Sequence, residues 1–143
     1  MQLTQNFSLK EFTKTSVKAN NTPPQEFIPR LISVAKTLEV VRSVCGDRKI
    51  IVTSAYRSPA VNAAVGGSPT SAHAKGLAVD FIVEGLTNME VCKLIVNSGT
   101  IYFDQLIKEK SGKNEWTHLG LSLTKPRQQI LTYLNGKYYA GLV

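Results

Sequence analysis

Hydrophobic positions recur with a helical period in the first third of the chain. Between residues 25 and 44, apolar side chains stand every three or four positions, at Phe27, Leu31, Val34, Leu38 and Val41. This spacing predicts one face of a long helix that stops near Gly46. Ser8 and Glu11 form a capping box, which predicts a short helix before it. The prolines of NNTPP (20–24) end that short helix, since they remove backbone donors and fix φ.

From residue 49 onward, short β-branched or alternating runs replace the helical period and predict strands. These runs are KIIVTS (49–54), LAVDFIV (77–83), YFDQLIKE (102–109), EWTHLGL (115–121), QILTYL (129–134) and KYYAGL (137–142). Asn135-Gly136 joins the last two, and this pair favours a type I′ hairpin turn. A capping box at Thr87 and Glu90 predicts one more helix, ending near Asn97, and a helical turn is expected after Pro59.

This order of elements predicts an α+β fold. The helices come first, the strands cluster later, and few connections are long enough for the crossovers of a regular parallel sheet. We therefore expect a single domain over residues 1–143, with N-terminal helices and a mostly antiparallel sheet. A chain of 143 residues can bury a core without disulfides or structural metals.

Composition excludes several classes of protein. No apolar run approaches the roughly 20 residues that span a bilayer, and the first twelve residues lack the apolar core of a signal peptide. We expect no membrane span and no signal peptide. Cys45 and Cys92 lie far apart in no CxxC pattern, so buried free thiols are expected.

The formal net charge of +7 comes from 17 basic residues that are scattered along the chain. They form no tract of five or more, and aromatic residues do not alternate with them, so no nucleic-acid partner is expected. A diffuse positive field still favours polyanions, including those of a bacterial envelope.

The segment SAHAKGLAVD (71–80) contains two candidate metal ligands, His73 and Asp80. Seven extended residues would separate His73 from Asp80 by roughly 23 Å, at ~3.3 Å per residue. The chain must fold back if both are to bind one ion, and Gly76 makes a sharp reversal easy. Strand alternation then places Asp80 on one face with Ala78 and Ile82, opposite the apolar face of the strand.

The second histidine of the chain, His118, lies in EWTHLG. On a strand, Trp116, His118 and Gly120 share one face. Glu115 is three residues from His118, so a regular strand would send it to the other face. To reach the same site, Glu115 must lie at the junction between loop and strand, where the backbone can bend.

Two histidines and one aspartate suit zinc, with a fourth position left for water. Glu115 would then be available as a general base, and Arg57 could bind a carbonyl oxyanion or a substrate carboxylate. Each residue also has a purely structural interpretation: Asp80 could pair with a lysine, Arg57 could lie along the surface, and Glu115 could be solvated.

These segments resemble a known family. SAHAKGLAVD is similar to the S-x-H-x-x-G-x-A-x-D signature of the zinc D-Ala-D-Ala carboxypeptidase and L-alanyl-D-glutamate endopeptidase family, which shares its fold with the hedgehog signalling domain. TSAYRSPAVN resembles that family's G-x-R-S-x-x-x-N segment, and EWTHLGL its acid-x-x-His strand. The first 44 residues look like the compact phage and prophage branch, so the resemblance covers nearly the whole chain.

The resemblance implies one zinc ion per chain, held by His73, Asp80 and His118. It implies Glu115 as the catalytic base, Arg57 as the group that stabilises the oxyanion or docks a carboxylate, and Ser71 as a hydrogen-bonding partner of the substrate. The chain departs from the family pattern in two places. Leu119 and Gly120 follow the third ligand, where members commonly have a small β-branched residue and Ser, and Ser54 or Ala55 replaces the first Gly of the arginine segment. Both departures affect the shape of the pocket.

The expected function is therefore a zinc peptidase that cleaves stem peptides of bacterial peptidoglycan, of the phage endolysin type that cuts the L-alanyl-D-glutamate bond. A D-alanyl-D-alanine carboxypeptidase is the alternative, since one arginine would serve either substrate. A non-catalytic module that binds the cell wall or a protein partner on the same fold is a third possibility. We expect a monomer, made in the cytoplasm of the bacterial host, that acts on the wall after release.

Overall fold

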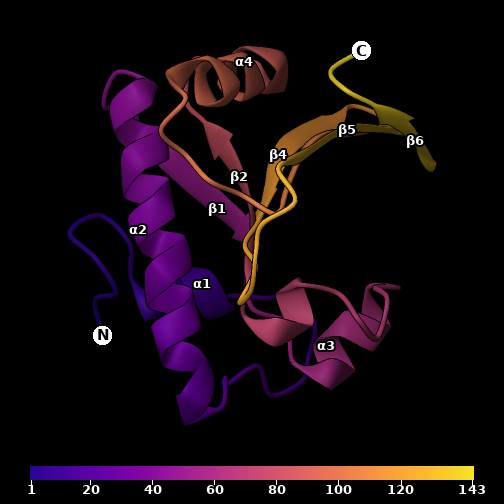
Figure 1. The fold of residues 1–143 in the computed structure, drawn as a ribbon. Helices are drawn as coiled ribbons and strands as arrows, with labels where there is room; N and C mark the ends of the chain where they lie inside the picture. Colours follow the sequence, from indigo (N-terminus) through magenta and orange to yellow (C-terminus); the bar gives the residue numbers. More distant parts are fainter.

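A six-stranded sheet forms the centre of the molecule, and helices pack on one of its faces (Figure 1). The computed structural model describes all 143 residues. The helices are α1 (Leu9–Thr13), α2 (Ile28–Val44), α3 (Pro59–Ala64) and α4 (Asn88–Ser98), with 3-10 turns η1 (Gln25–Phe27) and η2 (His73–Lys75). The strands are β1 (Ile50–Ser54), β2 (Ala78–Val83), β3 (Gln105–Ser111), β4 (Asn114–Gly120), β5 (Gln129–Leu134) and β6 (Lys137–Ala140).

The strands lie in the order β1-β2-β4-β3-β5-β6. All neighbours are antiparallel except β3 and β5, which run parallel. The parallel pair arises because residues 121–128 leave the end of β4 and return to the start of β3, where Gln129 N–H donates to the Asp104 carbonyl at 3.0 Å. The predicted α+β domain with a mostly antiparallel sheet is confirmed.

The local signals for helix starts and turns are also confirmed. Ser8 with Glu11, and Thr87 with Glu90, form complete capping boxes at α1 and α4. Asn135 (φ 46°) and Gly136 (φ 90°) adopt the left-handed conformation that the turn of the β5–β6 hairpin needs. The first helix is shorter than expected: α1 ends at Thr13, before the NNTPP segment.

The core lies between the sheet and the face of α2 and α4 that packs on it. Alternation along β2 sends Val79, Phe81 and Val83 into this core, and the predicted face of α2 is buried with them. The opposite face of β2 presents Asp80, and no helix covers that face of the sheet at β3 and β4. Cys45 and Cys92 are both buried free thiols, as expected.

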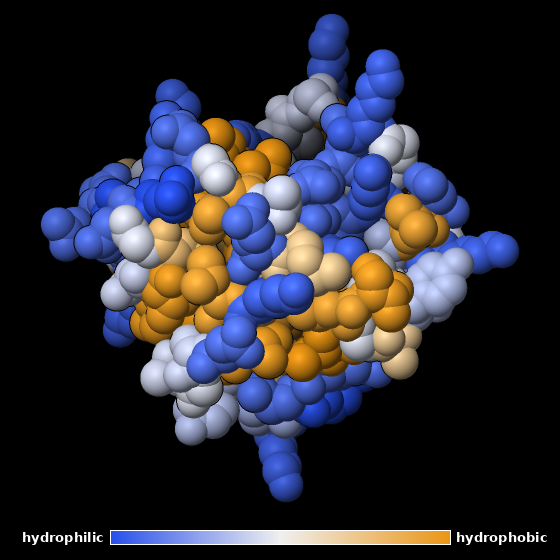
Figure 2. Space-filling view, turned by 90° about the horizontal axis from the view of Figure 1, so that it is seen from above, coloured by the Kyte–Doolittle hydropathy of each residue, from blue (hydrophilic) through white to orange (hydrophobic).

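The surface combines apolar and hydrophilic areas. Figure 2 shows apolar residues gathered on the face seen from above, with hydrophilic side chains around and across them. Helix α4, which is uppermost in Figure 1, exposes Leu94 and Val96, at 37% and 38%. None of the helices combines the length and apolar character that crossing a membrane requires.

The buried face of α2 yields a test of the core. Leu38→Ala removes a fully buried side chain, so we expect the free energy of unfolding to fall by about 2–5 kcal/mol. Val40→Ala, two residues away on the exposed side of the same helix, should change it by less than about 0.5 kcal/mol. Urea unfolding of the two variants measures both values, and equal losses would contradict this packing.

Candidate metal centre

His73 is presented by a sharp reversal between the loop and β2. It begins η2, and Gly76 closes this turn in the left-handed conformation (φ 71°). The Leu77 N–H then donates to the Ala72 carbonyl at 2.9 Å, which completes the reversal. The fold-back that the spacing of His73 and Asp80 requires is present, and Gly76 is the residue that allows it.

Two hydrogen bonds clamp His73 against the segment after β1. Its Nδ1 lies 2.7 Å from the Ala55 carbonyl oxygen, and its own carbonyl accepts from Arg57 N–H at 3.2 Å. A carbonyl oxygen only accepts, so Nδ1 donates to Ala55, and Nε2 is the ring nitrogen that faces Asp80. This is the arrangement that orients a metal-binding imidazole.

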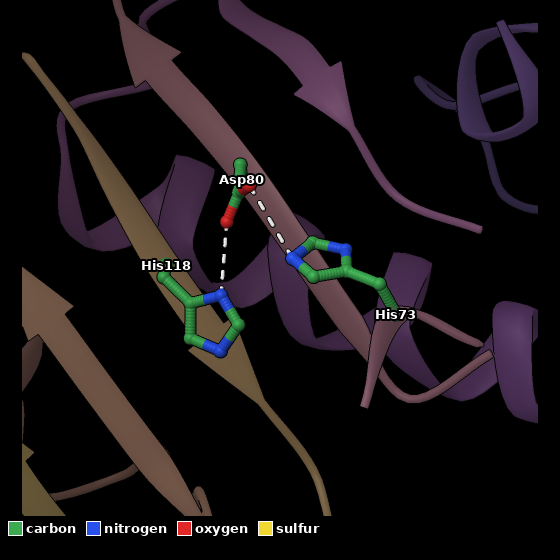
Figure 3. A group of neighbouring side chains, drawn as sticks. All are labelled: His73, Asp80 and His118. Atoms are coloured by element: carbon green, nitrogen blue, oxygen red, sulfur yellow. Dashed lines mark hydrogen bonds and ion pairs between the residues drawn. The ribbon is translucent and has the colours of Figure 1, made fainter. Parts of the chain in front are cut away.

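Asp80 and His118 come together through the pairing of β2 with β4. They are direct partners in the register, so their side chains project from the same face. His118 Nδ1 lies 2.9 Å from Asp80 Oδ1, and His73 Nε2 lies 3.3 Å from Asp80 Oδ2. Figure 3 shows the three side chains converging from η2, β2 and β4.

These three residues fit a divalent metal ion. One ligand atom from each lies within 4.8 Å of the others. Donor atoms about 2 Å from a tetrahedral ion are roughly 3.3 Å from one another, so the group is close to a coordinating geometry. All three also line a cleft of about 720 Å³, from which a substrate can approach.

Arg57 and Ser71 complete this part of the cleft. Arg57 donates from Nε to Ser54 Oγ at 3.1 Å, and its Nη2 lies 3.5 Å from Asp80 Oδ2. The Ser71 hydroxyl oxygen accepts from His73 N–H at 3.2 Å, which leaves its own proton available to a ligand. Both residues line the cleft, where the sequence predicts them.

The carboxyl of Asp80 is held in its ionised form. Burial alone would raise its pKa, but the charge of His73 and the hydrogen bond from His118 outweigh burial and hold the pKa well below its ordinary range. An ionised carboxylate is the form that binds a metal cation.

Glu115 does not reach this site. It is the second residue of β4 and pairs regularly with Lys110, so the backbone does not bend there. Its side chain lies on the opposite face of the sheet from His118, where Oε1 accepts from Asn88 N–H at 2.9 Å. At the first turn of α4, this carboxylate supplements the cap and interacts favourably with the helix dipole.

Glu109 occupies the place in the cleft that the sequence assigned to Glu115. It lies on β3 two residues from Ile107, the direct partner of His118, so alternation turns it to the metal-site face. Its Oε1 is 3.8 Å from His118 Nδ1, and the side chain is 14% exposed. Burial, and then the charge of Asp80, raise the pKa of Glu109 to about 7.

The signal for Glu109 was present in the hairpin itself. A tight turn at Gly112 pairs Ser111 with Asn114, and the antiparallel register then places Glu109 opposite Trp116. The acid-x-x-His motif instead predicts Glu115 as the acid of the site. Trp116 was expected on the His118 face, and it lines the cleft there; its buried indole N–H has no hydrogen-bond partner in the chain.

The comparison with known families agrees with this geometry. Residues 5–120 match the family described as peptidase M15. The chain belongs to the peptidase M15 family. This confirms the resemblance to the zinc D-Ala-D-Ala carboxypeptidase family, while placement in a phage or prophage branch stays a prediction. No curated protein matches the chain.

The match contains every residue of the site described above. It ends at the last residue of β4, so β5 and β6 of this M15 peptidase lie outside the matched segment.

Removal of one ligand should weaken metal binding strongly. We expect His118→Ala to lose at least a hundredfold in affinity for a divalent transition metal, because two protein ligands do not replace three. Glu115→Gln should bind as the wild type does. Isothermal titration of the two metal-free variants measures this difference, and unchanged binding by His118→Ala would place the ion elsewhere.

The raised pKa of Glu109 predicts a pH dependence of stability in the metal-free protein. At pH values between 4.5, the ordinary pKa of a glutamate, and about 7, Glu109 is protonated in the folded chain but ionised in the unfolded chain. The contribution of this proton to the free energy of unfolding is fully present below pH 4.5 and is lost as the pH rises through 7. Wild type should therefore lose on the order of 2 kcal/mol more than Glu109→Gln between pH 4.5 and 8. Urea unfolding with a chelator checks this, and parallel pH curves would contradict it.

Proposed function

We propose that the protein is a zinc-dependent peptidoglycan peptidase that hydrolyses a peptide bond in bacterial stem peptides. One observation carries the proposal: two histidines and an aspartate share a cleft with a partly buried glutamate and an arginine, in a chain of the peptidase M15 family. A metal site, a base and a cation in one cleft are the parts that peptide hydrolysis needs.

The residues that would hold the zinc ion are His73, Asp80 and His118. Nitrogen ligands with one carboxylate suit zinc, and three protein ligands are typical of catalytic rather than structural sites. When bound, zinc would polarise the scissile carbonyl and lower the pKa of its water to about 7.

Glu109 is the proposed general base. It shares the cleft with the ligands, whereas Glu115 lies across the sheet. Glu109 accepts a proton from the attacking water and then delivers it to the leaving amine. The partial burial of this carboxylate strengthens its affinity for the proton it must take and later release.

Arg57 and Ser71 are the proposed substrate contacts. The hydrogen bond from Nε to Ser54 holds the Arg57 guanidinium at the mouth of the site, where its other N–H groups can donate to a developing oxyanion or to a substrate carboxylate. Ser71 donates its hydroxyl proton to the substrate near His73.

The bond we favour is L-alanyl-D-glutamate, as in an endolysin-type endopeptidase. The cleft is lined by residues of the segment 66–75, by the metal ligands and by Tyr138 of β6. It therefore has room for a peptide that extends on both sides of the ion. The alternative D-alanyl-D-alanine carboxypeptidase would use Arg57 for the terminal carboxylate. A non-catalytic binding module would have no need of a glutamate beside the ligands.

Two isosteric substitutions separate the base from the structural glutamate. Glu109→Gln should retain zinc but lose about 10²–10⁴-fold in kcat, the range that a general base contributes. Glu115→Gln should keep kcat within about threefold, because the Glu115 carboxylate accepts from Asn88 N–H at the start of α4, on the other face of the sheet.

The measurement is mass spectrometry of purified muropeptides after digestion, with zinc content determined on the same samples. Cleavage after L-alanine supports the endopeptidase, and loss of one terminal alanine would identify the carboxypeptidase. Loss of activity in Glu115→Gln with full activity in Glu109→Gln would reverse the assignment of the base, and no cleavage of either bond would overturn the proposed function.

A further inference from the structure

A row of side chains crosses four strands on the cleft face of the sheet. In the register, Glu109 of β3 faces Trp116 of β4 on one side and Tyr133 of β5 on the other, and Tyr133 in turn faces Tyr138 of β6. Paired positions project their side chains to the same face, so the two tyrosines continue the surface that bears Glu109 and His118.

Tyr138 belongs to the same cleft as the metal ligands. It lines the cleft together with Glu109, and it is 61% exposed. Tyr133 packs beside it, with ring centroids 4.9 Å apart and planes at 57°. Partial burial, and then the charge of Glu109, raise the pKa of the Tyr138 phenol, which agrees with a position near the base. Tyr138 thus presents a solvent-facing ring in the cleft, and the partly buried ring of Tyr133 packs against it.

Membership of the M15 family does not account for this surface. The family match ends at residue 120, and both tyrosines lie beyond it in the C-terminal hairpin. Neither ring belongs to the buried core cluster, so packing of the core does not require them. A role in binding explains why the hairpin presents Tyr138 to the cleft with Tyr133 beside it.

We propose that Tyr133 and Tyr138 form an aromatic platform that binds a sugar ring of the glycan to which the stem peptide is attached. The proposal rests on the proposed function. Stem peptides contain small and charged residues, with no large apolar side chain that would match a pair of phenol rings. A pyranose has an apolar C–H face that stacks on an aromatic ring and hydroxyl groups that can pair with the phenol oxygen.

The experiment compares two substrates: a disaccharide-bearing stem peptide, and the same peptide after removal of the sugar. Wild type should favour the sugar-bearing substrate by roughly five- to tenfold in kcat/KM. Tyr138→Ala should abolish this preference through KM, with kcat changed by less than about twofold. Tyr138→Phe, which keeps the ring, should retain most of the preference.

Tyr139→Ala is the matched control. Tyr139 neighbours Tyr138 on the same strand and is 43% exposed, but it pairs with Thr132 and faces the other side of the sheet. This variant should keep the preference. Equal turnover of the two substrates by wild type, or an equal effect of Tyr138→Ala and Tyr139→Ala, would overturn the platform.

A binding measurement separates this proposal from the proposed function. Zinc-loaded Glu109→Gln is titrated with each of the two peptides by calorimetry, so that no hydrolysis is needed. Roughly five- to tenfold tighter binding of the sugar-bearing peptide, lost in Glu109→Gln/Tyr138→Ala, supports the platform even if no bond is cut. Equal affinities overturn the platform while leaving hydrolysis of the stem peptide intact.

Discussion

The buried carboxylate of Asp80 is the group around which the site is organised. A carboxylate removed from water is strongly destabilising unless cations or donors surround it. Here His73 and His118 contact its two oxygens, and Arg57 approaches one of them at 3.5 Å. These partners come from η2, from β4 and from the segment after β1, so the electrostatic requirement of one side chain ties together three separate parts of the chain. A bound cation would meet the same requirement, which is why this arrangement suits a metal site.

The backbone prepares these partners before any ion arrives. Hydrogen bonds in both directions between His73 and the segment Ala55–Arg57 fix the imidazole and the arginine relative to each other. The pairing of β2 with β4 fixes Asp80 relative to His118. Ligands held in this way lose little conformational freedom on binding, and that pre-organisation contributes to affinity.

Strand alternation decides which acid can take part in the chemistry. Both Glu109 and Glu115 lie near the β3–β4 hairpin, but only Glu109 shares a face with His118. The same alternation carries the cleft surface outward to Tyr133 and Tyr138. Alternation of side chains along the strands therefore separates the face that bears the cleft from the face that packs on α2 and α4.

The elements of this protein and the group of residues that could hold a metal were readable from its sequence, because the signals involved are local. Capping boxes, the apolar face of α2, the Asn135-Gly136 turn and the reversal at Gly76 all depend on residues within a few positions of each other. The signature from Ser71 to Asp80 is likewise a single short segment. The parallel pairing of β3 with β5 and the placement of Glu115 under α4 were decided only by the tertiary structure. Each depends on contacts between residues that are distant in the sequence, which no local signal specifies.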